Sequence, residues 1–334
     1  MKYYKLLKIN SLIKSNRLKI LGVSVLALFN KRFYSVFLDP VLSCNFRCLM
    51  CYFSDPEYKP SHSKFELENL PIVADKFFKN ALKLQIGCGA EPSLYKHNVE
   101  IIQLAKKYNV PHISFTTNAS LLNYDKIYEL VSAGLDEIIV SMHGTSKEVY
   151  EKMMPGSNFE KFNEILSDIS KIKNEFPNFK LRINYTVNPD NINDLNNFEY
   201  YLKNYSIDIL QIRPIRKVQN SIYNDFDLKR KQKVYTEIVS NLELLCQKYN
   251  IISIITPKIP DAKILRKVPN VAEYTYCYVS ADYWGEDGFK GKNMSYRKFL
   301  FKAGFFKSII KDVFFTKSRL IEADVNFGNY EVNV

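Results

Sequence analysis

The sequence predicts an α/β fold, an incomplete (β/α)6 TIM-like barrel. Short apolar runs alternate with amphipathic stretches, a pattern typical of β-α units that build a parallel sheet. The run 138–140, after an acidic start, is continuously apolar, as expected of a parallel strand buried on both faces. The expected strands are Phe33–Asp39, Leu82–Gly87, His112–Thr116, Glu137–Ser141, Lys180–Val187 and Ile209–Pro214, and the expected helices lie near Phe65–Asn80, Asn98–Tyr108, Asp125–Ala133, Phe159–Asn174 and Asn191–Asn204.

The chain divides into one catalytic domain with an extension at each end. Its 334 residues and 46% hydrophobic content are enough for a full core, and no internal repeat or long Gly/Ser linker interrupts it. We expect a basic, apolar N-terminal extension over 1–32, the partial barrel over 33–256, and a C-terminal appendage over 257–334.

Three cysteines, Cys44, Cys48 and Cys51, follow the first expected strand with C-x3-C-x2-C spacing. In barrels of this kind the chemistry lies at the carboxyl ends of the strands, which is where these cysteines fall. Three thiolates on a four-iron cluster leave one iron without a protein ligand, and an open position can bind a substrate or cofactor. A zinc site and three unrelated buried thiols are the alternatives; a structural zinc site takes four ligands, and the nearest histidine is His62.

The spacing, with the apolar Met50 before the third cysteine, resembles the cluster motif of the radical S-adenosylmethionine (radical SAM) superfamily. The resemblance implies a [4Fe-4S] cluster and S-adenosyl-L-methionine, reductively cleaved to a 5′-deoxyadenosyl radical that abstracts hydrogen from a substrate. It also implies an electron donor such as flavodoxin or ferredoxin and a cytoplasmic location, since the cluster is oxygen-labile. The substrate is not predicted, and a non-catalytic binding or regulatory protein on the same barrel remains an alternative.

Segments after later strands are similar to other motifs of this family. The segment 87–92 resembles its Gly-Gly-Glu-Pro segment, although Ala90 replaces one glycine, and 116–119 is similar to its Thr-Asn-Gly. Carried over from the family, the cofactor-binding residues are Gly89, Ala90, Glu91, Asn118, Ser141 and Met50. For 87–92 alone, an ordinary turn between strand and helix is the competing interpretation.

Two further residues have two interpretations each. His143, after the fourth strand, is a candidate catalytic proton donor or substrate contact, or else a packed side chain. Arg182 shares one strand face with Asn184 by period two, and either binds the cofactor carboxylate or caps the barrel.

The remaining cysteines, Cys88, Cys246 and Cys277, are expected to be plain buried thiols. Many members of the family carry a cysteine-rich C-terminal module of the SPASM or twitch type. Two thiols after the core are too few for such a module, so the sequence predicts one cluster only.

The formal net charge of +12 is concentrated at the two ends. Residues 1–38 hold eight Lys/Arg and no acid, and 290–319 hold nine with one acid, so each segment carries +8 and the remainder −4. Nucleic-acid binding is not favoured, because no matching motif is present and the basic residues lie at the ends. The abundance of Tyr, Phe, Lys, Asn and Ile fits an AT-rich bacterial genome.

Both basic segments are also apolar. The run Ile20–Phe29 is shorter than the roughly twenty residues needed to span a bilayer, and Tyr296–Phe315 is expected to form a basic amphipathic helix. Either these segments pack on the barrel, or they contact the inner membrane face or another anionic partner. In the second case an anionic, lipid-linked or glycan-linked substrate is the better expectation.

Overall fold

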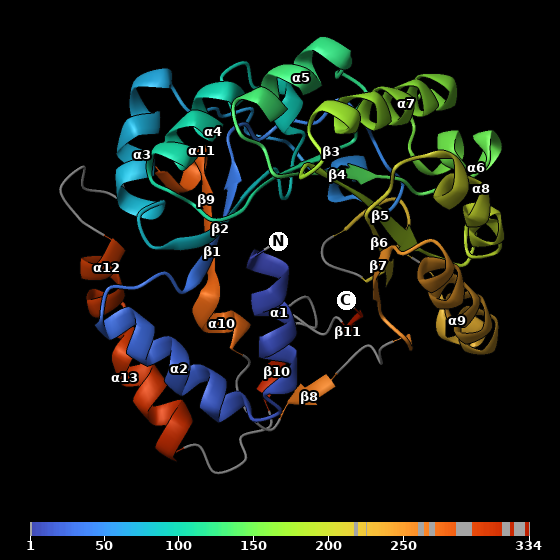
Figure 1. Cartoon of the computed structure of the whole chain (residues 1–334). Coiled ribbons are helices and arrows are strands. Elements are labelled where there is room, and N and C mark those ends of the chain that lie inside the picture. Colours follow the sequence, from blue (N-terminus) through green and yellow to red (C-terminus); the bar gives the residue numbers. More distant parts are fainter. Residues whose placement is uncertain are drawn as a thin grey trace.

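The computed structural model describes residues 2–216, 220–224, 226–259, 264–266, 271–284, 296–315, 321–323 and 331–333. Within them, one curved sheet has the order β11-β7-β6-β5-β4-β3-β2-β1-β9, with eight parallel strands and an antiparallel β11 (Figure 1). The predicted α/β partial barrel is confirmed. The strands are β1 Tyr34–Asp39, β2 Ala81–Ile86, β3 Ile113–Thr117, β4 Glu137–Ser141, β5 Lys180–Val187, β6 Ile209–Pro214, β7 Ile252–Ile255, β9 Tyr276–Ser280 and β11 Glu331–Asn333, and β8 Ile264–Arg266 pairs with β10 Ile321–Ala323.

Helices cover the outer face of the sheet, because the outward side chains of the strands are apolar. Ile138 and Val140 of β4 and Ile183 of β5 are fully buried in the main core. The covering helices are α3 Leu70–Phe77, α4 Asn98–Lys107, α5 Tyr124–Ser132, α6 Lys147–Met153, α7 Phe159–Glu175, α8 Phe198–Asn204 and α9 Gln232–Lys248.

The sheet is wider than the six strands expected. β7 follows β6, and β9 pairs in parallel with β1 on the opposite edge. Since β9 comes from the segment expected as an appendage, the boundary at 256 does not separate the barrel from a second unit.

The inner face of the sheet is polar. Register places Gln85, Ser114 and Glu137 side by side on β2, β3 and β4, and Asn184 beside Gln211 on β5 and β6. A barrel that fills itself with branched apolar side chains has no room for a ligand. This polar lumen is therefore the place where the fold can receive one.

The two ends of the chain pack against the barrel. The helix α1 Lys2–Leu12 lies at the centre of the ring of strands in Figure 1, with Tyr4 buried. The helix α2 Asn16–Leu28 lies alongside α13 Phe305–Ile310, and α12 Tyr296–Lys302 precedes α13. Two short helices, α10 Ala272–Thr275 and α11 Ala281–Trp284, flank β9. None of the helices in the described ranges has the length and apolar content that crossing a bilayer requires.

Candidate functional site

The three cysteines occupy one loop that begins where β1 ends. The backbone N–H of Cys51 donates to the Cys48 carbonyl at 2.9 Å, which closes a turn around the second and third cysteines. The Arg47 N–H donates to the Pro155 carbonyl at 3.2 Å, and the Leu49 N–H to the Met153 carbonyl at 3.1 Å. The connection between β4 and α7 therefore holds the loop at the carboxyl edge of the sheet.

The cysteine thiols share one partly buried environment. Burial, together with the charges that Glu91 and Cys51 would carry, raises the pKa of Cys44 to about 11. Burial and the other two cysteines raise the pKa of Cys48 still further. Three thiolates this close need a cationic group among them, which fits an iron–sulfur cluster.

The geometry of the loop bears on which group that is. No set of three His, Cys, Asp or Glu side chains in the described part of the chain converges tightly enough to hold a single metal ion. A zinc ion needs its sulfur ligands about 2.3 Å from one point. A four-iron cluster takes each thiolate on a different iron and so does not need that convergence.

The segment after β2 approaches the cysteine loop closely. At Gly87, which has φ +82°, an added Cβ would lie 2.4 Å from the Thr116 carbonyl oxygen. At Gly89 an added Cβ would lie 3.0 Å from the Tyr52 hydroxyl, next to the cysteine loop. Ala90 is half-buried beside these glycines. Glycine is required at position 87, where both the positive φ and the neighbouring backbone exclude a side chain, whereas at position 89 a Cβ would fit only if the Tyr52 or Asp39 side chain shifted.

Asp39, the last residue of β1, orients this segment and was not among the predicted site residues. Its buried carboxylate accepts hydrogen bonds from the Cys88 N–H at 2.7 Å, the Gly89 N–H at 3.0 Å and the Tyr278 hydroxyl at 2.8 Å. Burial raises the pKa of Asp39, and these donors oppose the rise. An acidic residue that ends an apolar strand was the available signal.

Glu91 is used inside the protein. Oε1 accepts from the Ser93 N–H at 3.0 Å and from the Ser93 and Thr117 hydroxyls at 2.6 Å each. Oε2 accepts from the Asn118 N–H at 2.7 Å, and the Glu91 N–H donates to the Ser43 carbonyl at 2.9 Å. Since both carboxylate oxygens are occupied and the side chain is 3% exposed, Glu91 positions the loops rather than facing an open space.

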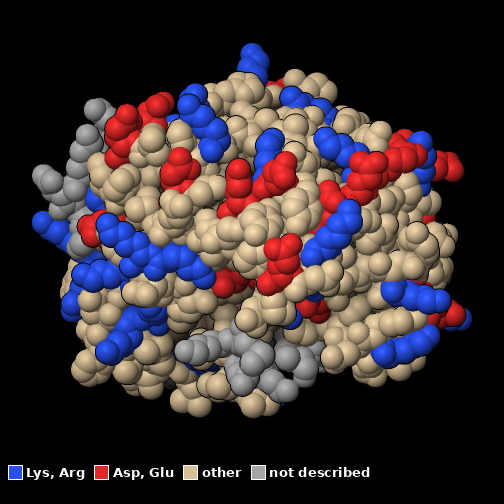
Figure 2. All heavy atoms as spheres, turned by 45° about the horizontal axis from the view of Figure 1, so that its top comes forward, with Lys and Arg blue, Asp and Glu red and all other residues tan. Residues whose placement is uncertain are grey.

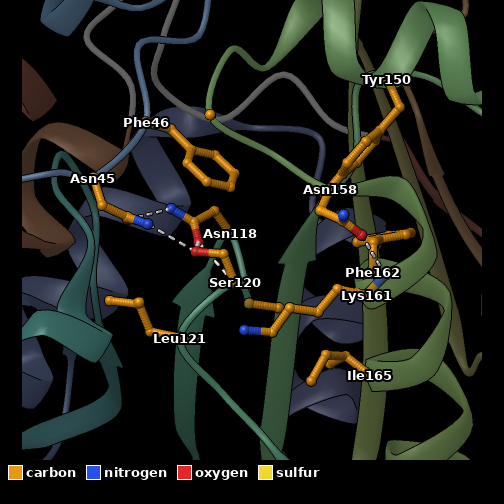
Figure 3. Close-up of a pocket in the computed structure, with 12 residues that line it drawn as sticks. Asn45, Phe46, Asn118, Ser120, Leu121, Tyr150, Asn158, Lys161, Phe162 and Ile165 are labelled. Atoms are coloured by element: carbon orange, nitrogen blue, oxygen red, sulfur yellow. Dashed lines mark hydrogen bonds between the residues drawn. The ribbon is translucent and has the colours of Figure 1, made fainter.

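Asn118 continues the same network to the cysteine loop. Its Nδ2 donates to Asn45 Oδ1 at 3.0 Å, and its Oδ1 accepts from the Ser120 hydroxyl at 2.7 Å (Figure 3). Asn45 Nδ2 donates in turn to Ser120 Oγ at 2.8 Å. Ala119, next in the chain, has φ +65°, a conformation that costs an alanine about 1 kcal/mol. The structure thus gives Asn118 the task of fixing the residue that follows Cys44.

A cavity of about 220 Å³ lies behind this network, between the cysteine loop, the loop after β3 and α7. Figure 3 shows the Phe46 ring at one side and Lys161 reaching from α7 toward the β3 loop. At the cavity wall the side-chain amides of Asn45 and Asn118 hydrogen-bond to each other, and Asn45 also donates to Ser120. These bonds join the cysteine loop to the loop after β3, and the cavity lies between the two loops.

Ser141 ends β4 and faces the polar lumen beside Asn184, its register partner on β5. The side-chain oxygens Asn184 Oδ1 and Thr116 Oγ1 are buried and have no protein hydrogen-bond partner. Buried polar atoms are normally satisfied, so unpaired acceptors in a lumen indicate a bound ligand or water. The lumen at this level fits a polar cofactor or substrate.

His143 follows Ser141 and is held as a neutral ring. Burial and the nearby positive charge of Arg213 lower the pKa of His143 to about 3. Its Nδ1 accepts from the Thr186 N–H at 3.2 Å, so the ring proton lies on Nε2. A neutral histidine can donate a hydrogen bond from Nε2 but has no extra proton to transfer near pH 7.

Arg213 is an exposed cation at the end of β6, and it was not among the predicted site residues. Its Nε donates to Thr186 Oγ1 at 3.2 Å, which fixes the guanidinium on the lumen face. Desolvation raises the pKa of Cys88, at the end of β2, to about 11, and the charge of Arg213 opposes that rise. Arg213 therefore faces the mouth of the lumen, and its position at a strand end was the signal that could have identified it.

Of the two interpretations of Arg182, its contacts favour a cap for the barrel over a contact with the cofactor. The Arg182 guanidinium pairs with Glu137 Oε1 at 2.6 Å and contacts the Tyr4 hydroxyl of α1. Although burial opposes it, Arg182 and His112 hold the pKa of Glu137 well below its usual range. Arg182 lies five residues before the end of β5, about 16 Å from the carboxyl edge, so it belongs to a buried cluster at the amino end.

Met50 and the three remaining cysteines differ in their contacts and exposure. Met50 Sδ accepts a hydrogen bond from Asn188 Nδ2 at 2.9 Å, which ties the cysteine loop to the end of β5. Cys246 and Cys277 are buried, as expected, whereas Cys88 is exposed toward the lumen, where its sulfur lies 3.7 Å from the Tyr276 hydroxyl. That part of the expectation was wrong because Cys88 lies past the end of its strand.

Comparison with known proteins finds sequences that are similar to this chain. A family profile described as the radical SAM superfamily matches residues 40–198. A probable GTP 3′,8-cyclase of Saccharolobus solfataricus is 27% identical over 211 residues, which cover 62% of this chain and 66% of that protein. A probable GTP 3′,8-cyclase of Thermoplasma volcanium is 34% identical over 110 residues, 33% of this chain and 32% of that protein. The chain thus spans less than two thirds of the curated relatives that it matches.

Solved structures agree at the level of the fold. SuiB of Streptococcus suis bound to S-adenosylmethionine has a TM-score of 0.57 and 13% identity, covering 78% of this chain and 61% of SuiB. SuiB bound to its precursor peptide SuiA has a TM-score of 0.59 and 14% identity over the same shares. These structures support the fold, whereas the profile match over residues 40–198, which contain the cysteine loop at the end of β1, identifies the chain as a member of the radical SAM superfamily of enzymes.

Proposed function

We propose that this chain uses Cys44, Cys48 and Cys51 to hold one [4Fe-4S] cluster, and uses S-adenosyl-L-methionine for a radical reaction on a substrate in the lumen. One observation carries the proposal: three thiols share one loop at the carboxyl edge of the sheet, in front of a lumen with unpaired buried acceptors. The chemistry that cluster and cofactor supply when bound is one-electron cleavage of a carbon–sulfur bond and abstraction of a hydrogen atom.

The residues of the chain position these groups. The network through Glu91 and Asn118 fixes the loop that carries Cys44, and Asn188 fixes Met50 beside Cys51. Asp39 turns the backbone at Gly89 toward the cysteine loop. Ser141 and Asn184 offer hydroxyl and amide groups to a polar ligand. In this arrangement His143 orients a ligand by hydrogen bonding and remains neutral.

We infer that the substrate is polar and carries an anionic group. Arg213 is exposed at the mouth, and its orientation is fixed through Thr186. At the other end of the barrel, α1 and the Glu137–Arg182 pair occupy the opening, so a substrate enters from the mouth. Two relatives provide precedents: the Saccharolobus protein is a probable GTP 3′,8-cyclase, and SuiB binds the precursor peptide SuiA.

The reducing interior of a cell is the proposed location, because the open cluster is oxygen-labile. A flavodoxin or ferredoxin is the proposed electron donor. Cys88, Cys246 and Cys277 are proposed to be free thiols, which leaves one cluster per chain.

Anaerobic reconstitution with iron and sulfide tests the proposal. We expect about four irons per chain, a brown chromophore, and 5′-deoxyadenosine when dithionite and S-adenosylmethionine are added. Cys48→Ala should lose iron and product. Cys88→Ala is the matched control, since this exposed thiol lies in the same mouth but outside the cysteine loop, and it should keep the iron.

Three outcomes would contradict the proposal. Iron without 5′-deoxyadenosine would favour a binding or regulatory protein that has lost turnover. Zinc without iron or sulfide in anaerobically purified protein would favour a zinc protein. Loss of about half of the iron in Cys88→Ala would indicate a second cluster rather than one.

A further inference from the structure

The helix α2 has two apolar faces. Ile20, Val23 and Ala27 are buried against the rest of the protein. On the opposite side, Leu18, Leu21, Val25 and Phe29 are exposed at spacings of three and four residues, with Leu18 at 62% and Phe29 at 72%. A soluble protein normally gives such a helix one apolar face and one polar face. The exposed apolar side chains on α2 therefore do not stabilise the core, which indicates that they have another role.

The C-terminal segment that packs against α2 also exposes apolar side chains, since α13 and the turn after it contact α2 (Figure 1). Phe301 of α12, Ile310 of α13 and Phe314 of the following π-helical turn Lys311–Phe315 are exposed, Phe314 at 65%. We call these three residues, together with Leu18, Leu21, Val25 and Phe29, the apolar face. Its two parts come from segments that are about 280 residues apart in the sequence, and the fold brings them together.

The surroundings of the apolar face are basic. Exposed Lys14 and Lys31 flank α2, exposed Arg17 lies in its first turn, and exposed Lys302 and Lys307 belong to α12 and α13. Residues 1–38 contain no acidic residue, and the described segment 296–315 contains one, Asp312. By contrast, the outer helices in Figure 2 show basic and acidic side chains intermixed. The excess positive charge of the chain thus gathers where large apolar side chains are exposed.

We propose that the apolar face docks on the surface of an anionic lipid bilayer. Exposed apolar side chains that insert at the headgroup boundary, within a ring of cations, are the features of an interfacial membrane-binding surface. A second copy of this chain is the weaker occupant, because it would set two strongly basic surfaces against each other. Each Lys or Arg near an anionic membrane contributes favourably instead.

The C-terminal part of the apolar face is attached near the start of β1. Phe33 contacts Phe305 of α13, with ring centroids 5.9 Å apart, and Tyr34 contacts Tyr296 of α12 at 4.5 Å. Both contacts are at the start of β1, whereas the cysteine loop follows its end. The helices α12 and α13 are therefore anchored at the opposite end of β1 from the cysteine loop.

Co-sedimentation with vesicles tests the proposal, with the full chain kept anaerobic. We expect retention on equimolar phosphatidylcholine and phosphatidylglycerol vesicles and little on phosphatidylcholine alone. The triple variant Leu18→Ser, Val25→Ser, Phe29→Ser should lower the partition coefficient by about tenfold or more. Raising ionic strength from about 0.1 M to about 1 M should also weaken retention, since it shortens the Debye length from about 10 Å to about 3 Å.

The matched control is Leu67→Ser, Val234→Ser, Leu244→Ser, which removes three exposed apolar side chains elsewhere on the surface and should not change retention. Failure of the wild-type chain to bind anionic vesicles would overturn the proposal. So would equal retention of the two triple variants, or a dimer in light scattering that depends on the apolar face without vesicle binding. Formation of 5′-deoxyadenosine without vesicles is measured separately, so failure of docking leaves the proposed function intact.

Discussion

Replacing Glu91 with glutamine is the sharpest perturbation of the network behind the cysteine loop. The carboxylate accepts three hydrogen bonds on Oε1 and one, from the Asn118 N–H, on Oε2. The least disruptive placement of the new amide sets its NH2 group opposite the Asn118 N–H, because that arrangement loses one bond rather than three. Asn118 is 7% exposed, so water cannot readily replace the acceptor.

The magnitude follows from two opposing terms. A lost hydrogen bond to a charged group costs about 1.5–3 kcal/mol. Burial raises the pKa of Glu91, so removing the charge returns part of the cost of burying it. We expect Glu91→Gln to lower the free energy of unfolding by about 1–2 kcal/mol and to reduce the iron bound on reconstitution, since Asn118 holds Asn45 next to Cys44.

The assay is urea unfolding of the iron-free protein without S-adenosylmethionine, followed by anaerobic iron determination. Glu100→Gln is the matched control, because this carboxylate on α4 is partly exposed and pairs with His97 at the surface, so its change should stay within about 0.5 kcal/mol. If Glu91→Gln left the stability of the iron-free protein unchanged and raised only the Kd for S-adenosylmethionine, Glu91 would contact the cofactor directly. The positioning role would then be refuted.

Three further predictions use other parts of the barrel. Arg182→Met should lower the free energy of unfolding by about 3–5 kcal/mol, because it leaves the buried Glu137 carboxylate without its ion pair; a higher Kd for S-adenosylmethionine in the folded variant would restore a cofactor role. His143 has a pKa lowered to about 3 in the folded chain, so its contribution to stability is complete above the unfolded value of about 6.5 and is lost as pH falls toward 3. Between pH 7 and pH 5, urea unfolding of the wild type should therefore show a loss of stability up to about 2 kcal/mol larger than that of His143→Asn, and equal losses would contradict the burial of the ring. Tyr278→Phe should weaken S-adenosylmethionine binding severalfold at unchanged iron content, because Asp39 loses one donor that fixes the turn at Gly89; titration calorimetry showing an unchanged Kd would exclude that coupling.

The central strands could be predicted from the sequence because their signals are local. The predicted bounds of Glu137–Ser141, Lys180–Val187 and Ile209–Pro214 are those of β4, β5 and β6. In each of these strands the side chains on the outer face are apolar, and the residues beyond the strand no longer follow that apolar pattern. The order of motif segments at the strand ends also placed the cysteine loop correctly, since parallel strands end at one edge.

The missed features depend on contacts between distant segments. β9 pairs with β1, whose register partners are about 240 residues earlier, and nothing in the local pattern of 276–280 indicates that partner. Period two put Arg182 on the lumen face correctly, but periodicity does not reveal how far along the strand the reaction site lies. Glu91 and Asn118 were predicted because they resemble motif residues. Their positioning role depends on hydrogen bonds that join three loops, which the sequence alone does not reveal.

The position of α1 inside the barrel affects the order in which the chain assembles. The hydroxyl of Tyr4 contacts Arg182, a residue 178 positions later, so α1 leaves the ribosome well before β5 and acquires this partner only after β5 has been made. Contacts of such long sequence separation form late because the loop must close first. Until then, the tyrosines of α1 are available to chaperones or to other nascent chains. Synthesis from the ribosome should therefore be more prone to aggregation when α1 is present and translation is paused before residue 182 than when the pause falls after residue 256.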